Sequence, residues 1–341
     1  MAFGGNKNNP NNSAVVGEPP EDGVTKLCWS PQANFLIASS WDNSVRCWEV
    51  NDNGESAGRA MIQLESPALD ACWTSDGTMV FSACCDGKAY GWDLNADKHQ
   101  PVGVHQAPVR TVCWVDEVNL IATGSWDRFV RYWDGRAEQP AAEIEMPERV
   151  LCMDVRYPMA VCGTSDKKYT VFDLRKPTEP YKHANSPLKN QLRCVAAFPD
   201  MTGFILGSIE GRCAVQHVED NMQSKNFTFK CHRQDNYVYP VNAISFHPYG
   251  TFVTCGSDGG VNFWDKQSKQ RLANFAPCPV SVSAVAFNTP GNIVAYAMTY
   301  DWHKGASGYD AKIANAIYLH GVGDEQTKPR PKAATGGFGR R

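Results

Sequence analysis

The chain has 341 residues, 43% of them hydrophobic, and a formal net charge of -3. It is long enough to build a large core, and its near-neutral balance argues against a wholly basic nucleic-acid binder. No apolar run reaches the roughly 18 residues of a membrane helix and the first residues lack the apolar core of a signal peptide, so we expect neither membrane insertion nor secretion.

One pattern recurs seven times along the chain. An apolar run that ends in an aromatic residue is followed by a second apolar run that ends in an acidic turn, and then by a third run. The copies begin, in chain order, at "VTKLCWS", "ALDACWT", "VRTVCWV", "RVLCMDV", "LRCVAAF", "VNAISFH" and "VSAVAFN". The turn acids are Asp42, Asp86, Asp127, Asp166, Glu210, Asp258 and Asp301. They are about 40–45 residues apart, which is the period of WD-type propeller blades.

The repeat predicts an all-β fold, a single seven-bladed WD-repeat β-propeller. Each copy supplies three β-rich runs and a less regular fourth, such as "RAMIQLES", which together make a four-stranded blade. The seventh copy lacks a clear fourth strand, whereas "SAVVG" (13–17) is a short β-like run. We expect this N-terminal strand to close the ring on the last blade, because an edge would otherwise stay unpaired. The expected boundaries are a disordered N-terminal tail (1–12), the propeller (13–322) and a basic C-terminal tail (323–341).

Several residues are predicted to serve the fold. The tryptophans six positions after a turn acid, Trp48, Trp92, Trp133 and Trp264, follow the period and should pack between blades. In the third copy, His105, Ser125, Asp127 and Trp133 occupy the positions of the hydrogen-bonded tetrad familiar in WD repeats. The His–Asp pair resembles part of a catalytic triad, but it falls inside the repeat pattern, which favours a structural role.

The 13 cysteines have no framework spacing, and most sit inside strand-like runs. This pattern predicts buried free thiols rather than disulfides or zinc ligands. We expect no cofactor and no metal site.

Trp41 and Trp126 do not follow the period, because each directly precedes a turn acid where the pattern does not require an aromatic residue. In WD propellers this position lies on the top rim around the channel. Exposed aromatic residues are over-represented at binding hot spots, so the two rings predict a partner-binding rim. The alternative is that a loop half-buries each ring.

Several stretches go beyond the general repeat: "PEDG", "SSWDNSVRCWEV", "SPLKNQLRCVAAF", "GSIEGRCAVQHVE", "NFTFKCHR" and "AYAMTYDWHKGA". Through them the chain resembles, from about Pro19 to Val322, the nuclear-pore mRNA export factors of the Gle/Rae type. A sister family, the Bub-type mitotic checkpoint propellers, shares "PEDG" and "SSWD". "NFTFKCHR" and the run 299–305 are similar to the export branch. The chain departs from the family in its short connection between Arg233 and Tyr239.

The resemblance implies a non-enzymatic adaptor that binds the Gle-binding segment of an FG-repeat nucleoporin across its top face. Carried over by motif, Trp41, Trp126, Arg193 of "QLRC" and Arg212 of "SIEGR" would face that peptide. The family's binding segments carry glutamates, which suit the planar fork of a guanidinium group. The alternative for each arginine is a solvated residue or an intramolecular ion pair.

A second surface is suggested by Arg233, Trp302 and Lys304. Cations beside an aromatic ring are the chemistry of single-stranded RNA binding, and the resemblance implies that viral proteins bind this region as well. The alternative is a structural tryptophan in the closing blade. The end of the chain, "QTKPRPKAATGGFGRR", has five basic residues and no acid, so it either adds phosphate attraction or is a solvated end.

The predicted function is therefore an adaptor in nuclear mRNA export, located at the nucleus, the nuclear pore and the cytoplasm. The alternative is a kinetochore or spindle-checkpoint adaptor that binds checkpoint kinases. An enzyme is a third hypothesis. The sequence has no zinc helix motif, phosphate loop or nucleophile elbow, and the repeats leave little chain for a separate catalytic domain, so no catalytic residue is assigned.

Overall fold

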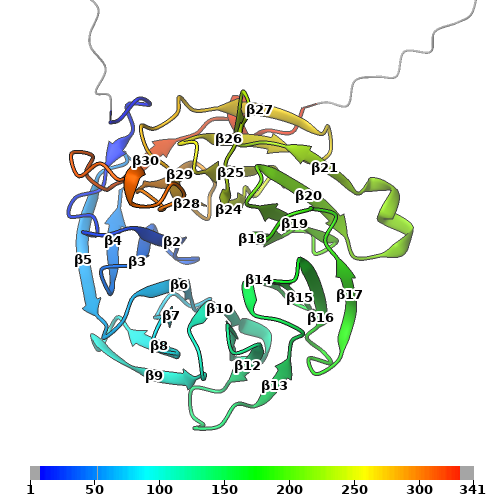
Figure 1. The fold of residues 1–341 in the computed structure, drawn as a ribbon. Helices are drawn as coiled ribbons and strands as arrows, with labels where there is room; N and C mark the ends of the chain where they lie inside the picture. The colour runs from blue at the N-terminus through cyan, green and yellow to red at the C-terminus, as the bar shows by residue number, and fades with distance from the viewer. Residues whose placement is uncertain (1–7, 52, 331–341) are drawn as a thin grey trace, which may run out of the picture.

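The computed structural model describes residues 8–51 and 53–330. Within them, seven four-stranded sheets stand around a central channel (Figure 1). Strands that follow one another in the chain pair antiparallel, and the first strand of each repeat copy lies nearest the channel. The predicted all-β, seven-bladed propeller is confirmed.

Within each blade the strands run outward from the channel. The first three blades are β2 (Val24–Trp29), β3 (Phe35–Ser40), β4 (Ser44–Val50), β5 (Ser56–Gln63); β6 (Ala68–Trp73), β7 (Met79–Cys84), β8 (Lys88–Asp93), β9 (Lys98–Val104); and β10 (Val109–Val115), β11 (Leu120–Ser125), β12 (Phe129–Trp133), β13 (Ala142–Glu145). The next two are β14 (Val150–Arg156), β15 (Met159–Thr164), β16 (Lys168–Asp173), β17 (Pro180–Asn185); and β18 (Leu192–Ala197), β19 (Gly203–Ser208), β20 (Arg212–His217), β21 (Phe227–Lys230). The last two are β24 (Val241–Phe246), β25 (Phe252–Gly256), β26 (Val261–Asp265), β27 (Gln270–Asn274); and β28 (Val282–Phe287), β29 (Ile293–Met298), β30 (Ala316–Gly321), β1 (Ala14–Val15).

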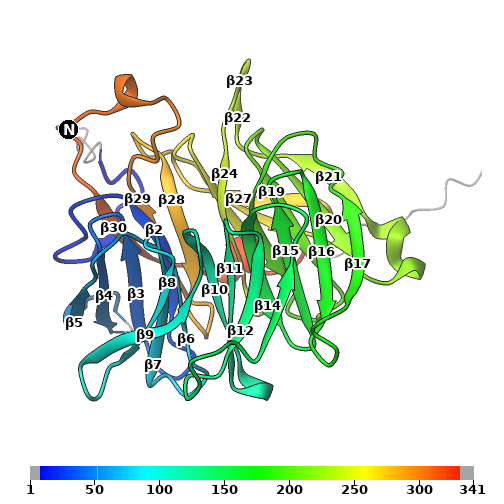
Figure 2. The ribbon, with the colours of Figure 1, turned by 60° about the horizontal axis from the view of Figure 1, so that its bottom comes forward.

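A few elements lie outside the blades. A two-stranded hairpin of β22 (Arg233–Gln234) and β23 (Tyr237–Val238) forms the connection between the fifth and sixth blades. Three short 3-10 turns cover Asp116–Val118, Asp220–Lys225 and Ala306–Gly308, and α1 spans Asp324–Thr327. Figure 2 shows that the hairpin and the segment between β29 and β30 rise above the same face of the ring.

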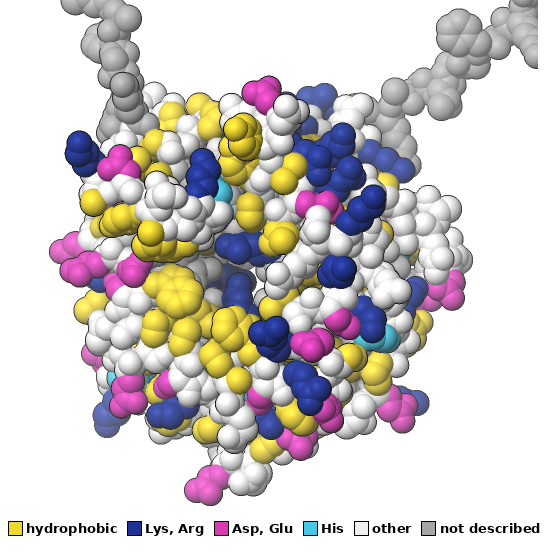
Figure 3. Space-filling model, in the orientation of Figure 1, with side chains coloured by type: hydrophobic (Ala, Val, Ile, Leu, Met, Phe, Trp, Pro, Cys, Tyr) yellow, Lys and Arg dark blue, Asp and Glu magenta, His cyan; other side chains and the backbone are white. Residues whose placement is uncertain are grey.

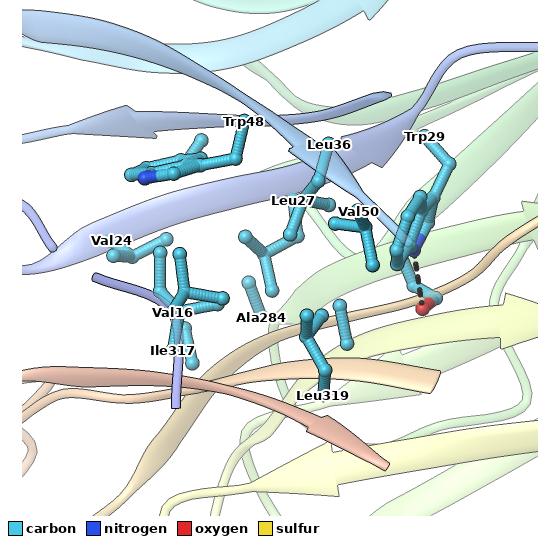
Figure 4. Close-up of a cluster of buried hydrophobic side chains, with 14 of the residues drawn as sticks. Val16, Val24, Leu27, Trp29, Leu36, Trp48, Val50, Ala284, Ile317 and Leu319 are labelled. Carbon is cyan, nitrogen blue, oxygen red and sulfur yellow. Dashed lines mark hydrogen bonds between the residues drawn. The ribbon is translucent and has the colours of Figure 1, made fainter. Parts of the chain in front are cut away.

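The ring is closed by the N-terminal strand, as predicted. Ala14 pairs with Leu319 and Val15 with Tyr318, so β1 becomes the outer strand of the last blade. Next to this pairing, Trp48 is 2% exposed and packs in a cluster that joins the first and last blades (Figure 4). Its indole N–H donates to the carbonyl of Gly17 at 2.9 Å. Trp48 therefore fastens the closing strand to the first blade.

The other periodic tryptophans also serve the blade interfaces. Trp92 and Trp133 are buried in clusters shared by neighbouring blades, and Trp264 is partly buried against the cluster between the fifth and sixth blades. The turn acids Asp42, Asp86, Asp127 and Asp258 each accept the backbone N–H two residues later. Glu210 differs, because its longer side chain accepts from Lys189 and Asn190 of the preceding loop.

Residues on both sides of the predicted propeller boundaries touch the ring. Asn11 exchanges hydrogen bonds with the backbone of Ala276, and the backbone carbonyl of Asn8 accepts from the Tyr318 hydroxyl at 2.5 Å. At the other end, Thr327 is buried and its carbonyl accepts from Thr251. Residues 1–7 and 331–341 of the predicted tails lie outside the described residues. The part of the chain that belongs to the ring thus extends at least from Asn8 to Thr327.

The 13 cysteines are free thiols, of which eight are buried and five are partly buried. Among the described residues, no helix combines the length and the apolar character needed to cross a membrane.

Candidate binding surface at the mouth of the channel

One face of the ring is built from the ends of the second strands and the beginnings of the inner strands; we call it the upper face. In the first three blades the residue before the turn acid donates its N–H to a carbonyl just ahead of the inner strand: Trp41 to Gly23, Cys85 to Pro67 and Trp126 to Pro108. The repeated bond fixes the backbone there, and in the first, third and fifth blades the side chain of that residue is exposed. This position is where sequence differences between blades can reach a partner.

Trp41 and Trp126 occupy this position in the first and third blades and remain exposed. Their exposed fractions are 46% and 37%, against 2% for Trp48. In the fifth blade the equivalent Ile209 is also exposed. Figure 3 shows hydrophobic side chains gathered on this side of the channel, over β2, β6 and β10. More than half of the surface of each of these two residues is nevertheless buried, so exposure alone does not decide between a partner-binding ring and a half-buried one.

Two arginines lie on inner strands that border the channel, in the third and fifth blades. Arg193 in β18 lies 3.8 Å from the carboxylate of Asp301, and its side chain keeps 37% of its surface exposed. Arg110 in β10 occupies the equivalent position of the third blade and donates to the carbonyl of Leu69 at 3.1 Å. Burial lowers the pKa of Arg193, and Arg110 acts in the same direction while Asp301 opposes it. Two guanidinium groups near one another and a single carboxylate leave a site that attracts an anion.

Arg212 begins β20 and is partly exposed. In the described part of the chain no ion pair or side-chain hydrogen bond holds its guanidinium group. Arg233 is different, because its guanidinium donates to the carbonyls of Glu210 at 2.9 Å and of Gly211 at 3.4 Å. Arg233 therefore supports the turn next to Arg212, and only part of its donor capacity is available for a ligand.

Trp302 and Lys304 lie in the segment that rises between β29 and β30. Trp302 is 52% exposed and stacks on Tyr309, with ring centroids 5.4 Å apart. The Lys304 ammonium lies 5.9 Å from the centre of the Tyr239 ring, at the base of the β22–β23 hairpin. Lys304, Tyr239 and Tyr300 help to line a pocket of about 200 Å³. The exposed ring of Trp302 thus stacks on Tyr309, whereas the Lys304 ammonium lies over Tyr239; that the two residues bind RNA together stays a prediction.

The two predicted surfaces adjoin one another. Gly23 lies between the Trp41 ring and the backbone carbonyl of Tyr300, and Arg193 reaches Asp301, the residue before Trp302. Asp301 also accepts from Asn242 at 2.9 Å and contacts His303 at 2.6 Å. A large ligand on one surface can therefore reach the other.

The predicted tetrad of the third blade forms, but with a different hydroxyl. His105 bonds to Asp127 at 2.9 Å and to Thr123 at 2.7 Å, and the Trp133 indole donates to the same Thr123 oxygen at 2.8 Å. The prediction that Ser125 belongs to this network is wrong. Its hydroxyl lies 3.0 Å from the carbonyls of Ala107 and Pro108, because Ser125 ends the strand and faces the preceding loop instead of the imidazole.

A second tetrad, which the sequence pattern did not reveal, stands in the sixth blade. His232 bonds to Asp258 at 2.8 Å and to Thr254 at 2.9 Å, and Trp264 donates to Thr254 at 2.9 Å. In both tetrads the imidazole is buried and both of its nitrogens are engaged. These His–Asp pairs hold blades together and have no free nitrogen with which to transfer a proton.

Comparison with known proteins agrees with this architecture. A model of the WD domain, G-beta repeat, matches residues 14–49, 65–93, 100–134 and 223–265. The chain is 45% identical over 335 residues to Protein RAE1 of Arabidopsis thaliana, which covers 96% of each chain. It is 44% identical to the mRNA export factor GLE2 of Chaetomium thermophilum, over 94% of this chain and 93% of that protein. It is 43% identical to the Poly(A)+ RNA export protein of Schizosaccharomyces pombe, over 93% of this chain and 92% of that protein.

The chain belongs to the mRNA export factor family. The resemblance stated from the motifs is thereby confirmed. On the upper face the structure places one arginine that the sequence analysis did not name, Arg110. The sequence could have revealed Arg110, because "VRT" and "LRC" put Arg110 and Arg193 at the same position of the repeat in the third and fifth copies. Among the described residues, no group of three or more His, Cys, Asp or Glu side chains is placed to hold a metal ion.

Proposed function

We propose that this chain is a non-enzymatic adaptor in nuclear mRNA export that works at the nuclear pore, between nucleus and cytoplasm. Support comes from its similarity along nearly the whole chain to proteins named as RNA or mRNA export factors. Further support comes from the upper face, where exposed aromatic rings and arginines surround the channel mouth.

The primary ligand in this proposal is the glutamate-bearing Gle-binding segment of an FG-repeat nucleoporin. The observation that carries it is the exposure of Trp41 and Trp126 at positions where the repeat needs no aromatic residue. Flat, rigid rings lose little entropy on binding and commonly act as anchors in interfaces. Arg193 and Arg212 then receive the glutamates, because a guanidinium group can bind a carboxylate through two parallel hydrogen bonds. Arg110 adds positive charge at the same mouth.

Peptide binding tests this assignment. The double variant Trp41→Ala, Trp126→Ala should weaken binding of a nucleoporin Gle-binding peptide at least about 100-fold, or roughly 2.7 kcal/mol, if both rings are anchors. Tyr181→Ala is the matched control, because Tyr181 is 56% exposed on the outer strand β17. Unchanged peptide affinity in the double variant, with unchanged melting, contradicts the assignment. Capture of a checkpoint kinase in place of a nucleoporin from nuclear extract would favour the checkpoint alternative.

The second ligand in this proposal is single-stranded RNA, on the segment that carries Trp302 and Lys304. The stacked pair of Trp302 and Tyr309 leaves one tryptophan face for a base, and Lys304 supplies charge for a phosphate. Arg233 contributes positive charge to RNA binding, but two of its hydrogen-bond donors are already used by the carbonyls of Glu210 and Gly211. Lys328 and Arg330 follow the opposite end of β30, where Lys328 pairs with Asp324 and Arg330 bonds to Gln270 and Leu272, so they do not adjoin this segment. The remaining basic residues of that tail lie outside the described residues.

An RNA titration over a salt series tests this second surface. Trp302→Ala should cost roughly 1–3 kcal/mol of RNA binding if a base stacks there. Lys304→Ala should reduce the slope of log affinity against log salt by about 0.7, the value for one phosphate on a single strand. Lys98→Ala, an equal change of charge on the outer strand β9, is the control. RNA binding that is unaffected by the first two variants removes this surface from the proposal and leaves the peptide site untouched.

A further inference from the structure

Two thiols lie against one another beside the upper face. The sulfur atoms of Cys213 and Cys231 are 3.7 Å apart. Cys213 is the second residue of β20, and Cys231 directly follows β21, whose last residue Lys230 pairs with Arg212. The N–H of Cys231 donates to the carbonyl of Gly211 at 3.0 Å, so Cys231 stands opposite Gly211. Since Cys213 comes two residues later on the same strand, both side chains lie on one face of the sheet as diagonal neighbours.

The environment distinguishes the two thiols. Cys213 is buried, whereas Cys231 is partly exposed. Burial raises the pKa of Cys213, and its hydrogen bond to Cys231 raises it further. Burial also acts to raise the pKa of Cys231, but the bond received from Cys213 and the adjacent His232 outweigh it and lower the pKa. Cys231 is thus the thiol that an oxidant can reach and that more readily becomes a thiolate, which is the reactive form.

We propose that Cys213 and Cys231 are a redox pair that a peroxide oxidises to a disulfide and that a dithiol reduces again. In the first step the Cys231 thiolate attacks one oxygen of hydrogen peroxide, the O–O bond breaks, and a sulfenic acid and hydroxide form. In the second step the Cys213 sulfur attacks the Cys231 sulfenic sulfur and displaces its oxygen as water, with the Cys213 proton neutralising the charge. Two thiols lose two electrons and two protons, and one peroxide becomes two waters.

The location of the pair gives its oxidation a structural consequence. A disulfide needs its sulfur atoms about 2.05 Å apart, so the two strands must approach from the present 3.7 Å contact. Cys231 donates its N–H to Gly211 and lies at the end of the outer strand, where the chain leaves the sheet. Its neighbour His232 belongs to the tetrad of the sixth blade, and Arg233 holds the turn next to Arg212. Closure of the bond therefore pulls directly on the loop that borders the upper face.

Peptide mapping of the oxidised full chain tests the proposal. The chain is titrated with hydrogen peroxide, remaining thiols are alkylated, and the protein is digested with trypsin without reduction. Cleavage after Arg212, Lys225, Lys230 and Arg233 releases the peptides 213–225 and 231–233. We expect these two peptides joined, with the loss of two hydrogens, at peroxide levels where the other cysteines are still alkylated. Dithiothreitol should separate them again.

Cysteine variants, and the oxidation state in which Cys231 is found, show whether the disulfide forms. Cys231→Ser should abolish the linked peptide, and Cys213→Ala should leave Cys231 as a sulfenic acid that a dimedone-type probe captures. Cys85→Ser, another partly exposed cysteine, is the control and should keep the link. Cys231 found only as sulfinic acid or still alkylated in the wild-type chain, with no linked peptide, overturns the proposal. A link that appears only after unfolding in urea overturns it as well.

Discussion

Replacement of Thr123 by valine tests how the tetrad of the third blade works. Valine has nearly the shape of threonine but cannot bond to His105 or to Trp133, whose nitrogens lie 2.7 and 2.8 Å from the hydroxyl oxygen. Both partners are buried, so water cannot replace the lost bonds. A buried polar group left without a partner costs about 1–3 kcal/mol. Two such groups give an expected loss of about 2–6 kcal/mol in the free energy of unfolding.

Ser125→Ala is the matched comparison. Ser125 is also fully buried; its hydroxyl bonds to loop carbonyls and accepts the Asp127 N–H at 3.0 Å. Its loss leaves one buried donor, the Asp127 N–H, without a partner and should cost about 1–3 kcal/mol, half of the value for Thr123→Val. Thr254→Val repeats the experiment in the sixth blade and should resemble Thr123→Val.

Urea denaturation followed by tryptophan fluorescence measures these differences, with melting temperature as a second measurement. The slopes against urea should agree among the variants, because none changes the surface exposed on unfolding. If Ser125→Ala destabilises the chain more than Thr123→Val, the hydroxyl has been assigned to the wrong residue and the tetrad argument fails.

Three further outcomes are expected. Trp48→Ala should lower the free energy of unfolding by about 3–5 kcal/mol, since its buried ring joins the first and last blades; a loss below about 1 kcal/mol in urea contradicts this. Burial, with Arg131 adding to it, lowers the pKa of His105, so the stabilisation from this histidine is present above pH about 6.5 and is lost as the pH falls. Asp258 and Cys231 outweigh burial and raise the pKa of His232, so the stabilisation from this histidine is present below pH about 6.5 and is lost as the pH rises. NMR titration of the imidazoles should show the lower midpoint for His105, and the opposite order would refute the assignment. Limited proteolysis should spare the ring, whereas a stable fragment that ends near Pro177 would be incompatible with a single closed unit.

The fold was predictable because the repeat carries it. Turn acids and tryptophans recur at blade spacing, and the missing outer strand of the last blade pointed to "SAVVG" at the other end of the chain. A propeller blade buries both faces, so the same residue types are required at the same places in every copy. Ring closure follows from the same requirement, since one blade would otherwise have an unpaired edge.

The tetrads show where sequence spacing is insufficient. The histidine precedes the aspartate by 22 residues in the third blade and by 26 in the sixth, because the β22–β23 hairpin lies between them. The inserted hairpin hid the second tetrad from a search at fixed spacing. The threonine precedes the tryptophan by 10 residues in both blades, since no insertion separates those strands. That shared interval would have selected Thr123 over Ser125 and would have found Thr254.

The same geometry explains why exposed aromatic and cationic side chains gather at the channel mouth. Most positions of a blade face a neighbouring blade, and there the side chain is fixed by packing. In several blades the residue before the turn acid and the second residue of the inner strand escape this restriction, although Ser257 and Leu69, which take these places in the sixth and second blades, are buried. Tryptophan takes the first of these positions at Trp41 and Trp126, and arginine takes the second at Arg110 and Arg193. These less restricted positions therefore let this chain build an aromatic and cationic surface without disturbing the contacts that hold the propeller together.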